Sequence, residues 1–143
     1  MKKKRILIVD DDKDLCFAIS SFLTINNFDV FLAGNGFDAL NIVADFINKN
    51  IHLDLLITDI HIPQLNGLEL TKKILESNKN LPVLLITADP DMEKEVYSLN
   101  GELIDILIKP FCVETLLFCI NKLLVKKCQS LKLEKNVNNL EAF

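Results

Sequence analysis

Residues 5–12 read RILIVDDD, an unbroken apolar run that leads directly into three carboxylates. A strand that is covered on both faces, as in a parallel sheet, consists of such a run and does not alternate with polar residues. Residues 55–57 and 83–86 are apolar runs of the same kind. The sequence therefore predicts a parallel sheet of buried strands, with acidic side chains at the carboxyl end of the first one.

Short apolar runs alternate with longer stretches of helical periodicity along the whole chain. We expect strands at residues 5–9, 28–33, 53–58, 82–87 and 104–108, and helices at 13–26, 37–48, 67–77, 91–99 and 113–127. Asp89 and Pro90 have the pattern of an N-cap followed by proline at the first helical position. Alternating strands and helices imply right-handed crossovers. The expected fold class is α/β, with helices on both faces of a five-stranded parallel sheet.

Length and composition limit the classes of function. A chain of 143 residues, half of them hydrophobic, suits one domain with one core. A net charge of -4 argues against a nucleic-acid partner. The apolar run after the basic N-terminus is too short for a signal peptide or a membrane span, so we expect a cytoplasmic protein without a membrane partner. The cysteines lack close metal-ligand spacing and are expected to be reduced thiols, with zinc binding as the alternative.

The last part of the chain differs from the rest in composition. Residues 128–143 are polar and rich in asparagine, although Leu133, Val137 and Leu140 recur at helical spacing. We therefore expect one domain over residues 1–127, followed by a linker, a tail or an extension of the last helix.

Polar residues that suit phosphoryl chemistry follow four of the predicted strands. Asp10, Asp11 and Asp12 follow the first, Asp59 the third, Thr87 ends the fourth and Lys109 follows the fifth. In an open parallel sheet, ligands bind beyond these carboxyl ends. Converging carboxylates repel one another, and oxygen ligands without imidazole or thiolate favour a hard ion such as Mg²⁺, or Mn²⁺. A hydroxyl and an ammonium could hold the remaining oxygens of a phosphoryl group.

Four motifs in this order resemble those of response-regulator receiver domains, over residues 4–127. The motifs are IVDDD (residues 8–12), TDIHIPQLNG (58–67), LPVLLITA (81–88) and KPF (109–111). The resemblance implies a flavodoxin-like, doubly wound sheet with strand order 2-1-3-4-5. It also implies a signalling phosphoacceptor rather than an enzyme with turnover, and a histidine kinase or phosphotransfer protein as partner.

The resemblance further assigns a role to each polar residue at the strand ends. It implies that Asp59 accepts the phosphoryl group, that the Thr87 hydroxyl and the Lys109 ammonium contact it, and that Lys109-Pro110 is a cis peptide. The implied metal ligands are Asp10 (through water), Asp11, Asp59 and the backbone carbonyl of His61. Asp12 is better explained as an acid at the start of a helix, and Gly67 as a turn residue.

The resemblance also suggests where phosphorylation is read out. Ile106 occupies the place of the family's usual switch aromatic, and Asn66 replaces the commoner aspartate before the loop glycine. Isoleucine is stiff at χ1 and lacks the polar tip of tyrosine, so we expect a smaller switch. Together with Tyr97, Phe111 and a leucine-rich last helix, Ile106 predicts an interface for a partner or for a homodimer on the face made by the fourth helix, fifth strand and fifth helix. The alternative is that the surplus apolar residues pack against the segment after Lys127.

The first helix offers candidates for kinase docking. Cys16, Phe17 and Ser20 lie outside the apolar stripe that we expect to face the sheet, namely Leu15, Ala18, Ile19, Phe22 and Leu23. An apolar Phe17 on an exposed edge suggests a docking contact.

Two other classes of function remain open. A phosphatase of the haloacid dehalogenase type also combines an aspartate, a hydroxyl, a lysine and Mg²⁺, but its nucleophile belongs to Asp-x-Asp-x-Thr after the first strand, and the threonine is missing here. An interaction module that has lost phosphorylation would not need the intact set of Asp59, Thr87 and Lys109. Magnesium-dependent labelling by acetyl phosphate separates these alternatives.

Overall fold

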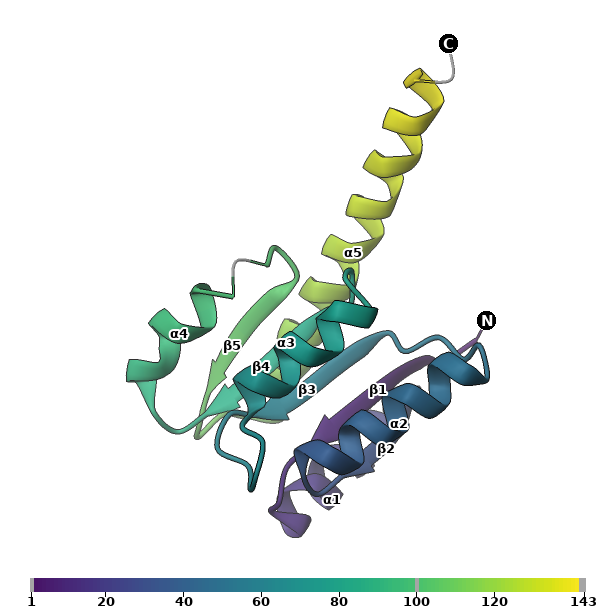
Figure 1. Ribbon diagram of the computed structural model, residues 1–143. Helices are drawn as coiled ribbons and strands as arrows, with labels where there is room; N and C mark the ends of the chain where they lie inside the picture. Colours follow the sequence, from purple (N-terminus) through teal and green to yellow (C-terminus); the bar gives the residue numbers. More distant parts are fainter. Residues whose placement is uncertain (1, 100, 142–143) are drawn as a thin grey trace.

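The computed structural model describes residues 2–99 and 101–141, and it has a five-stranded sheet between two layers of helices (Figure 1). The strand order is β2-β1-β3-β4-β5 with every pairing parallel, which confirms the predicted fold class. The elements are β1 (Lys4–Val9), α1 (Lys13–Ile25), β2 (Phe28–Ala33), α2 (Gly36–Asn48), β3 (Leu55–Asp59), α3 (Gly67–Ser77), β4 (Val83–Thr87), the 3₁₀ helix η1 (Pro90–Met92), α4 (Glu93–Tyr97), β5 (Ile104–Ile108) and α5 (Val113–Glu141).

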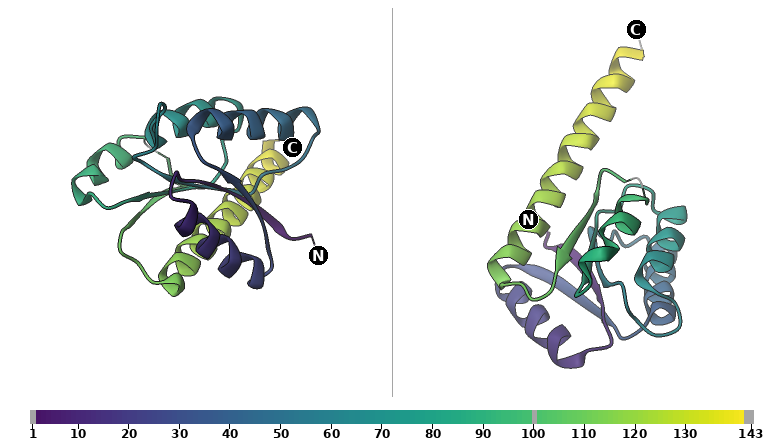
Figure 2. Two further views of the ribbon diagram at one scale, coloured as in Figure 1. Left: turned by 90° about the horizontal axis from the view of Figure 1, so that it is seen from below. Right: turned by 90° about the vertical axis from the view of Figure 1, so that its left-hand side faces the viewer.

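Two hydrophobic clusters hold the layers together, one on each face of the sheet. Along β1, Leu7 and Val9 belong to the cluster that includes residues of α2, α3 and α4. Ile6 and Ile8 point to the other face, against α1 and α5. Figure 2 shows α1 and α5 together on one side of the sheet and α2 and α3 on the other. Burial on both faces is the physical reason for the unbroken apolar runs.

The fourth helical segment is shorter than the sequence suggested. The expected helix at residues 91–99 is instead η1 followed by α4, which ends at Tyr97. The predicted cap is present: the Asp89 carboxylate accepts a hydrogen bond of 2.9 Å from the Asp91 N–H, and Pro90 takes the first position. Strand β3 begins at Leu55, two residues later than expected.

Helix α5 is the largest departure from the expected boundaries. It does not end at Lys127 but continues as one helix to Glu141, so the last residues extend the helix and project from the sheet (Figures 1 and 2). Leu131, Leu133 and Val137 are exposed on this extension. Residues 142 and 143 of the predicted linker or tail lie outside the described part of the chain. Within residues 2–99 and 101–141, no helix is long and apolar enough to cross a membrane.

Candidate functional site

The parallel register brings four predicted site residues to one edge of the sheet. Asp10 follows β1, Asp59 ends β3, Thr87 ends β4, and Lys109 follows β5. Strand β3 lies between β1 and β4, and Asp59 pairs with Ile86, the neighbour of Thr87. The acidic residues, the hydroxyl and the lysine therefore converge from four different strands, as the sequence predicted.

Lys109 joins the two buried carboxylates. Its ammonium donates a hydrogen bond of 2.5 Å to Asp59 Oδ2 and lies 3.5 Å from Asp10 Oδ2. Both aspartates are buried, whereas Asp11 is exposed. The Lys109 backbone N–H donates to the Thr87 carbonyl at 2.8 Å, and the Lys109-Pro110 peptide is cis, as predicted. This backbone hydrogen bond thus fixes the Cα of Lys109, from which the side chain extends, beside the end of β4.

Burial and charge shift the proton affinities of these groups in a consistent way. Desolvation by burial raises the pKa of Asp10, and the negative charge of Asp59 adds to this, although the Asp12 N–H and Lys109 oppose it. Burial of the Lys109 ammonium lowers its pKa, but the hydrogen bond to Asp59 and the charges of Asp10 and Asp59 outweigh that effect and raise it overall. Lys109 is therefore charged at neutral pH, beside two carboxylates.

We expect Asp10→Asn to stabilise the metal-free fold at pH 7 by about 1 kcal/mol, a usual size for one substitution. Because the folded-state pKa of Asp10 is raised, its ionised form is disfavoured in the fold, and the penalty disappears as the pH falls through that raised pKa. Urea denaturation with a chelator should show the gain shrinking toward acidic pH. Asp11→Asn, at an exposed carboxylate, is the control and should show no such gain. Equal gains in both variants would contradict the explanation.

Short-range hydrogen bonds fix the orientation of the Asp59 carboxylate. Its Oδ1 accepts from the backbone N–H of His61 at 2.9 Å, while the His61 residue is exposed. The buried Thr58 hydroxyl donates to the Asp59 carbonyl at 2.9 Å, a contact that sequence reasoning missed. The only signal for Thr58 was a hydroxyl next to the predicted acceptor. The His61 contact with Oδ1 leaves Asp59 Oδ2 directed at Lys109, while the Thr58 contact holds the backbone of Asp59.

Thr87 is fully buried at the end of β4. Its hydroxyl oxygen accepts a hydrogen bond of 3.1 Å from the Asp89 N–H. Accepting this bond leaves the hydroxyl proton available for an oxygen that arrives between β3 and β4.

The two buried carboxylates fit a hard divalent cation better than a transition metal. Among residues 2–99 and 101–141, no group of three or more His, Cys, Asp or Glu side chains is arranged to hold a metal. Asp10 and Asp59 nevertheless converge on one ammonium, and Mg²⁺ needs only one or two carboxylates because it keeps several waters and takes phosphate oxygens. Asp12 instead caps α1, where its carboxylate accepts from the Leu15 N–H.

The three predicted switch residues lie on different faces of the sheet. Ile106 is half-buried against the cluster beneath α2, α3 and α4, whereas Phe111 packs against the cluster beneath α1 and α5. Tyr97, at the end of α4, is 61% exposed. At the predicted switch position on β5, an apolar residue therefore packs beside α4.

The predicted docking residues on α1 require a correction. Phe17 is 72% exposed and Ser20 is half-buried, but Cys16 is only 5% exposed, so the expectation that Cys16 lies on the surface was wrong. Its thiol donates to the Asp10 carbonyl, and burial, with nearby aspartates, raises its pKa to about 11. Ala18, expected in the core stripe, is exposed instead.

Comparisons with known proteins agree with this geometry. The family model "Response regulator receiver domain" matches residues 6–121. Response regulator MprA of Mycobacterium sp. (strain KMS) is 34% identical over 120 residues, which cover 84% of this chain and 50% of that protein. The chain thus spans about half the length of the curated relatives it matches.

Solved structures show the same fold. A CheY-like response regulator receiver domain protein from Methanospirillum hungatei superposes with a TM-score of 0.78 at 26% identity, covering 90% of this chain and 98% of that one. Response regulator TrrA from Thermotoga maritima, solved in complex with Mg²⁺-BeF, gives a TM-score of 0.71 at 28% identity and covers 84% and 98%. With its matched motifs, strand order and converging site residues, the chain belongs to the family of response regulator receiver domains.

Proposed function

We propose that Asp59 is the phosphoacceptor of this receiver domain and takes its phosphoryl group from a histidine kinase or a phosphotransfer protein. The observation that carries the proposal is the buried Asp59 carboxylate at the end of the central strand, hydrogen-bonded to the Lys109 ammonium. Thr87, on the adjacent strand, supplies a hydroxyl beside it. An acceptor, a cation and a donor are the parts that phosphoryl transfer needs.

In the proposed step, an oxygen of Asp59 attacks the phosphorus of a phosphohistidine. The P–O bond forms as the P–N bond breaks, and the electron pair returns to the imidazole nitrogen, which then takes a proton from water. Lys109 transfers its hydrogen bond from the carboxylate to a phosphoryl oxygen, and the Thr87 hydroxyl donates to another. Asp11, Asp59 and the His61 carbonyl, with Asp10 acting through water, would hold Mg²⁺ or Mn²⁺, which would neutralise phosphoryl charge.

Membership in the receiver family argues against the phosphatase alternative. A haloacid-dehalogenase nucleophile would follow β1, where Asp10 is buried and accepts from the Asp12 N–H. The carboxylate that contacts Lys109 most closely instead ends β3. We propose that the receiver unit spans residues 1–127 and that residues 128–143 serve as a linker or C-terminal tail, although α5 continues without a break to Glu141.

Acetyl phosphate labelling tests the proposal without the kinase. Intact-mass spectrometry should detect one added phosphoryl group when Mg²⁺ is present, and none when a chelator removes it. Labelling that persists in the presence of the chelator would contradict the metal assignment. If the chain is never labelled, the proposal is wrong and the alternative of an interaction module that has lost phosphorylation is favoured.

Kinase docking is predicted at the exposed part of α1 near the site. We expect Phe17→Glu to slow phosphoryl transfer from the cognate kinase at least tenfold, since loss of a central aromatic contact costs more than about 1.4 kcal/mol, while acetyl phosphate labelling stays unchanged. Ile25→Glu is the matched control, because Ile25 is also exposed but ends the same helix away from Asp59. Loss of both activities in Phe17→Glu would point to misfolding instead.

Readout is predicted on the face of α4, β5 and α5. Addition of beryllofluoride and Mg²⁺ should increase self-association of the wild type, and Ile106→Asp should abolish that increase because a carboxylate would replace a half-buried apolar contact. Sedimentation velocity measures both. Leu32→Asp, on the opposite edge strand β2, is the control. If beryllofluoride changes the self-association of neither the variant nor the wild type, a phosphorylation-dependent homodimer on this face is excluded, which leaves a different partner for this face.

A further inference from the structure

The side of α5 that faces away from the sheet carries two large apolar residues. Leu116, Ile120 and Leu123 form the buried side of this helix. On the opposite side, Phe118 is 68% exposed and Val125 is 55% exposed, seven residues apart. The exposed residues that share this side form what we call the α5 ridge: Glu114, Phe118, Asn121, Val125, Gln129 and Lys132.

The α5 ridge is distinct from the surface proposed for readout. Lys122, on the flank of α5 next to β5, has its ammonium 3.9 Å from Asp105 Oδ2. Cys119 lies on the same flank, near Asp105. Burial is the main cause of the raised pKa of its thiol, and the negative charge of Asp105 raises it further. Phe118 and Val125 project between this flank and α1, which lies on the same face of the sheet as α5 (Figure 2).

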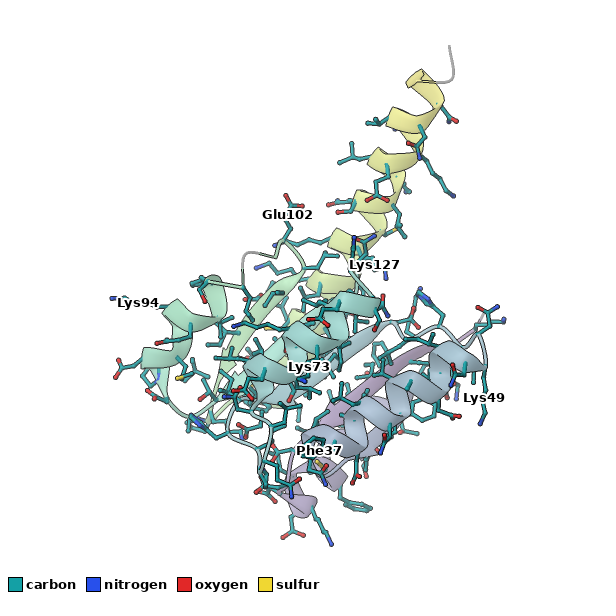
Figure 3. The ribbon with its side chains drawn as sticks, viewed as in Figure 1. Phe37, Lys49, Lys73, Lys94, Glu102 and Lys127 are labelled. Carbon is teal, nitrogen blue, oxygen red and sulfur yellow. The ribbon has the colours of Figure 1, made fainter. Side chains whose placement is uncertain are left out.

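The charges of the chain are distributed unevenly between its two ends. Acidic residues gather where helices begin, beyond the carboxyl ends of the strands: Asp10, Asp11, Asp12, Asp14, Asp38, Asp59, Asp89, Asp91, Glu93 and Glu114. Lysines predominate at the opposite end, which carries Lys4, Lys49, Lys79, Lys126, Lys127 and Lys132 and also the acids Asp54, Glu76 and Glu102. Figure 3 shows Lys49 and Lys127 at the end from which α5 projects. The α5 ridge follows this division, with Glu114 at the acidic end and Lys132 at the basic end.

This division determines which orientation of a second copy is favourable. Two parallel copies would place acidic end beside acidic end and Lys132 beside Lys132, which electrostatic repulsion disfavours. Two antiparallel copies place each acidic end beside a basic one. With a two-fold axis between Asn121 and Lys122, Phe118 and Val125 are equidistant from the axis, because each lies about 5 Å along the helix from it.

We propose that the α5 ridge binds a second copy of this chain in antiparallel orientation, independently of phosphorylation. Phe118 of each copy packs on Val125 of the other, and Glu114 of each lies within reach of Lys132 of the other. An isologous contact of this kind closes on itself and leaves no further ridge exposed. The pairing covers Phe118, the one aromatic residue of α5, and opposes unlike charges at both ends.

Sedimentation velocity of the unphosphorylated chain, without Mg²⁺ or beryllofluoride, tests the contact. The wild type should form a dimer that weakens with added salt, and Phe118→Glu should be a monomer. Tyr97→Glu, at a similarly exposed aromatic residue on α4, should leave the dimer intact. A wild type that is monomeric at every concentration, or a dimer that survives Phe118→Glu, overturns the proposal. Thermal unfolding of Phe118→Glu establishes that the variant is folded.

Charge reversal tests the orientation. Glu114→Lys and Lys132→Glu should each raise the dimer dissociation constant about tenfold, because each turns two symmetric attractions into repulsions. The double variant, which exchanges the two charges, should recover wild-type affinity. The rescue is expected only in the antiparallel arrangement, because in a parallel pair residues 114 and 132 do not face each other. Failure of the rescue therefore excludes the antiparallel arrangement. Because no arm requires phosphorylation, failure here leaves the role proposed for Asp59 untouched.

Discussion

Intact-mass spectrometry should find no phosphoryl group on Asp59→Asn after incubation with acetyl phosphate and Mg²⁺, where the wild type gains one. The amide removes the nucleophilic oxygen but preserves the size of the side chain and its acceptor for the His61 N–H. Asp59 is the carboxylate that combines burial, the end of the central strand and the hydrogen bond to Lys109. Complete loss of labelling is therefore expected, with the fold retained.

Asp54→Asn provides a matched control on the same segment. Asp54 is also buried, but it precedes β3 at the other edge of the sheet, where it pairs with Lys4 and accepts from the Arg5 N–H. This variant should be labelled like the wild type. Labelling of Asp59→Asn at the wild-type rate would move the acceptor elsewhere, and Asp10, the other carboxylate near Lys109, would be the next candidate.

Gly67→Ala should lower the free energy of unfolding by about 2 to 3 kcal/mol, at the upper end of the cost of overpacking. A Cβ at this position would overlap the backbone carbonyl of Asp59 and lie 2.9 Å from the Cα of Ile60, and backbone atoms cannot move aside as a flexible side chain would. The Gly67 N–H also donates to the Ile60 carbonyl at 2.8 Å. The substitution thus pushes α3 away from the strand end that holds Asp59, and labelling should slow as well.

Gly34→Ala is the control for Gly67→Ala, because a Cβ at Gly34 has no neighbouring heavy atom within 4 Å. Urea denaturation should give Gly34→Ala a stability within about 0.5 kcal/mol of the wild type, as expected for surface substitutions. Similar losses in both variants would show that conformational preference, rather than the close approach to Asp59, determines the cost at Gly67.

Gly67 also shows where reasoning from sequence stopped. Its place after Pro63 indicated a turn glycine, and the structure does show a helix beginning there, but none of the described glycines has a positive φ. The requirement comes from the backbone of β3, which approaches Gly67 closely in the folded chain. The local sequence does not predict this close approach, because the approach depends on how α3 packs against the end of β3.

Helix α1 illustrates the same limit. Apolar residues occupy more than one side of this helix, so periodicity alone favoured a stripe containing Ala18 and left Cys16 outside it. The structure buries Cys16 with Ile19 and Leu23 and exposes Ala18. The sheet and α5 determine which side of α1 is buried. The residues of α1 alone do not specify those contacts.

The sequence by itself determined the class of fold and the composition of the site. Strands buried on both faces must be unbroken apolar runs, so β1 and β4 were recognisable locally, and the residues that follow parallel strands must meet at one edge. Asp59, Thr87 and Lys109 were identified in this way. Only the tertiary structure decided which carboxylates are buried around Lys109, namely Asp10 and Asp59 but not Asp11, and that α5 continues to Glu141. Burial depends on contacts between segments far apart in the chain, which no local pattern specifies.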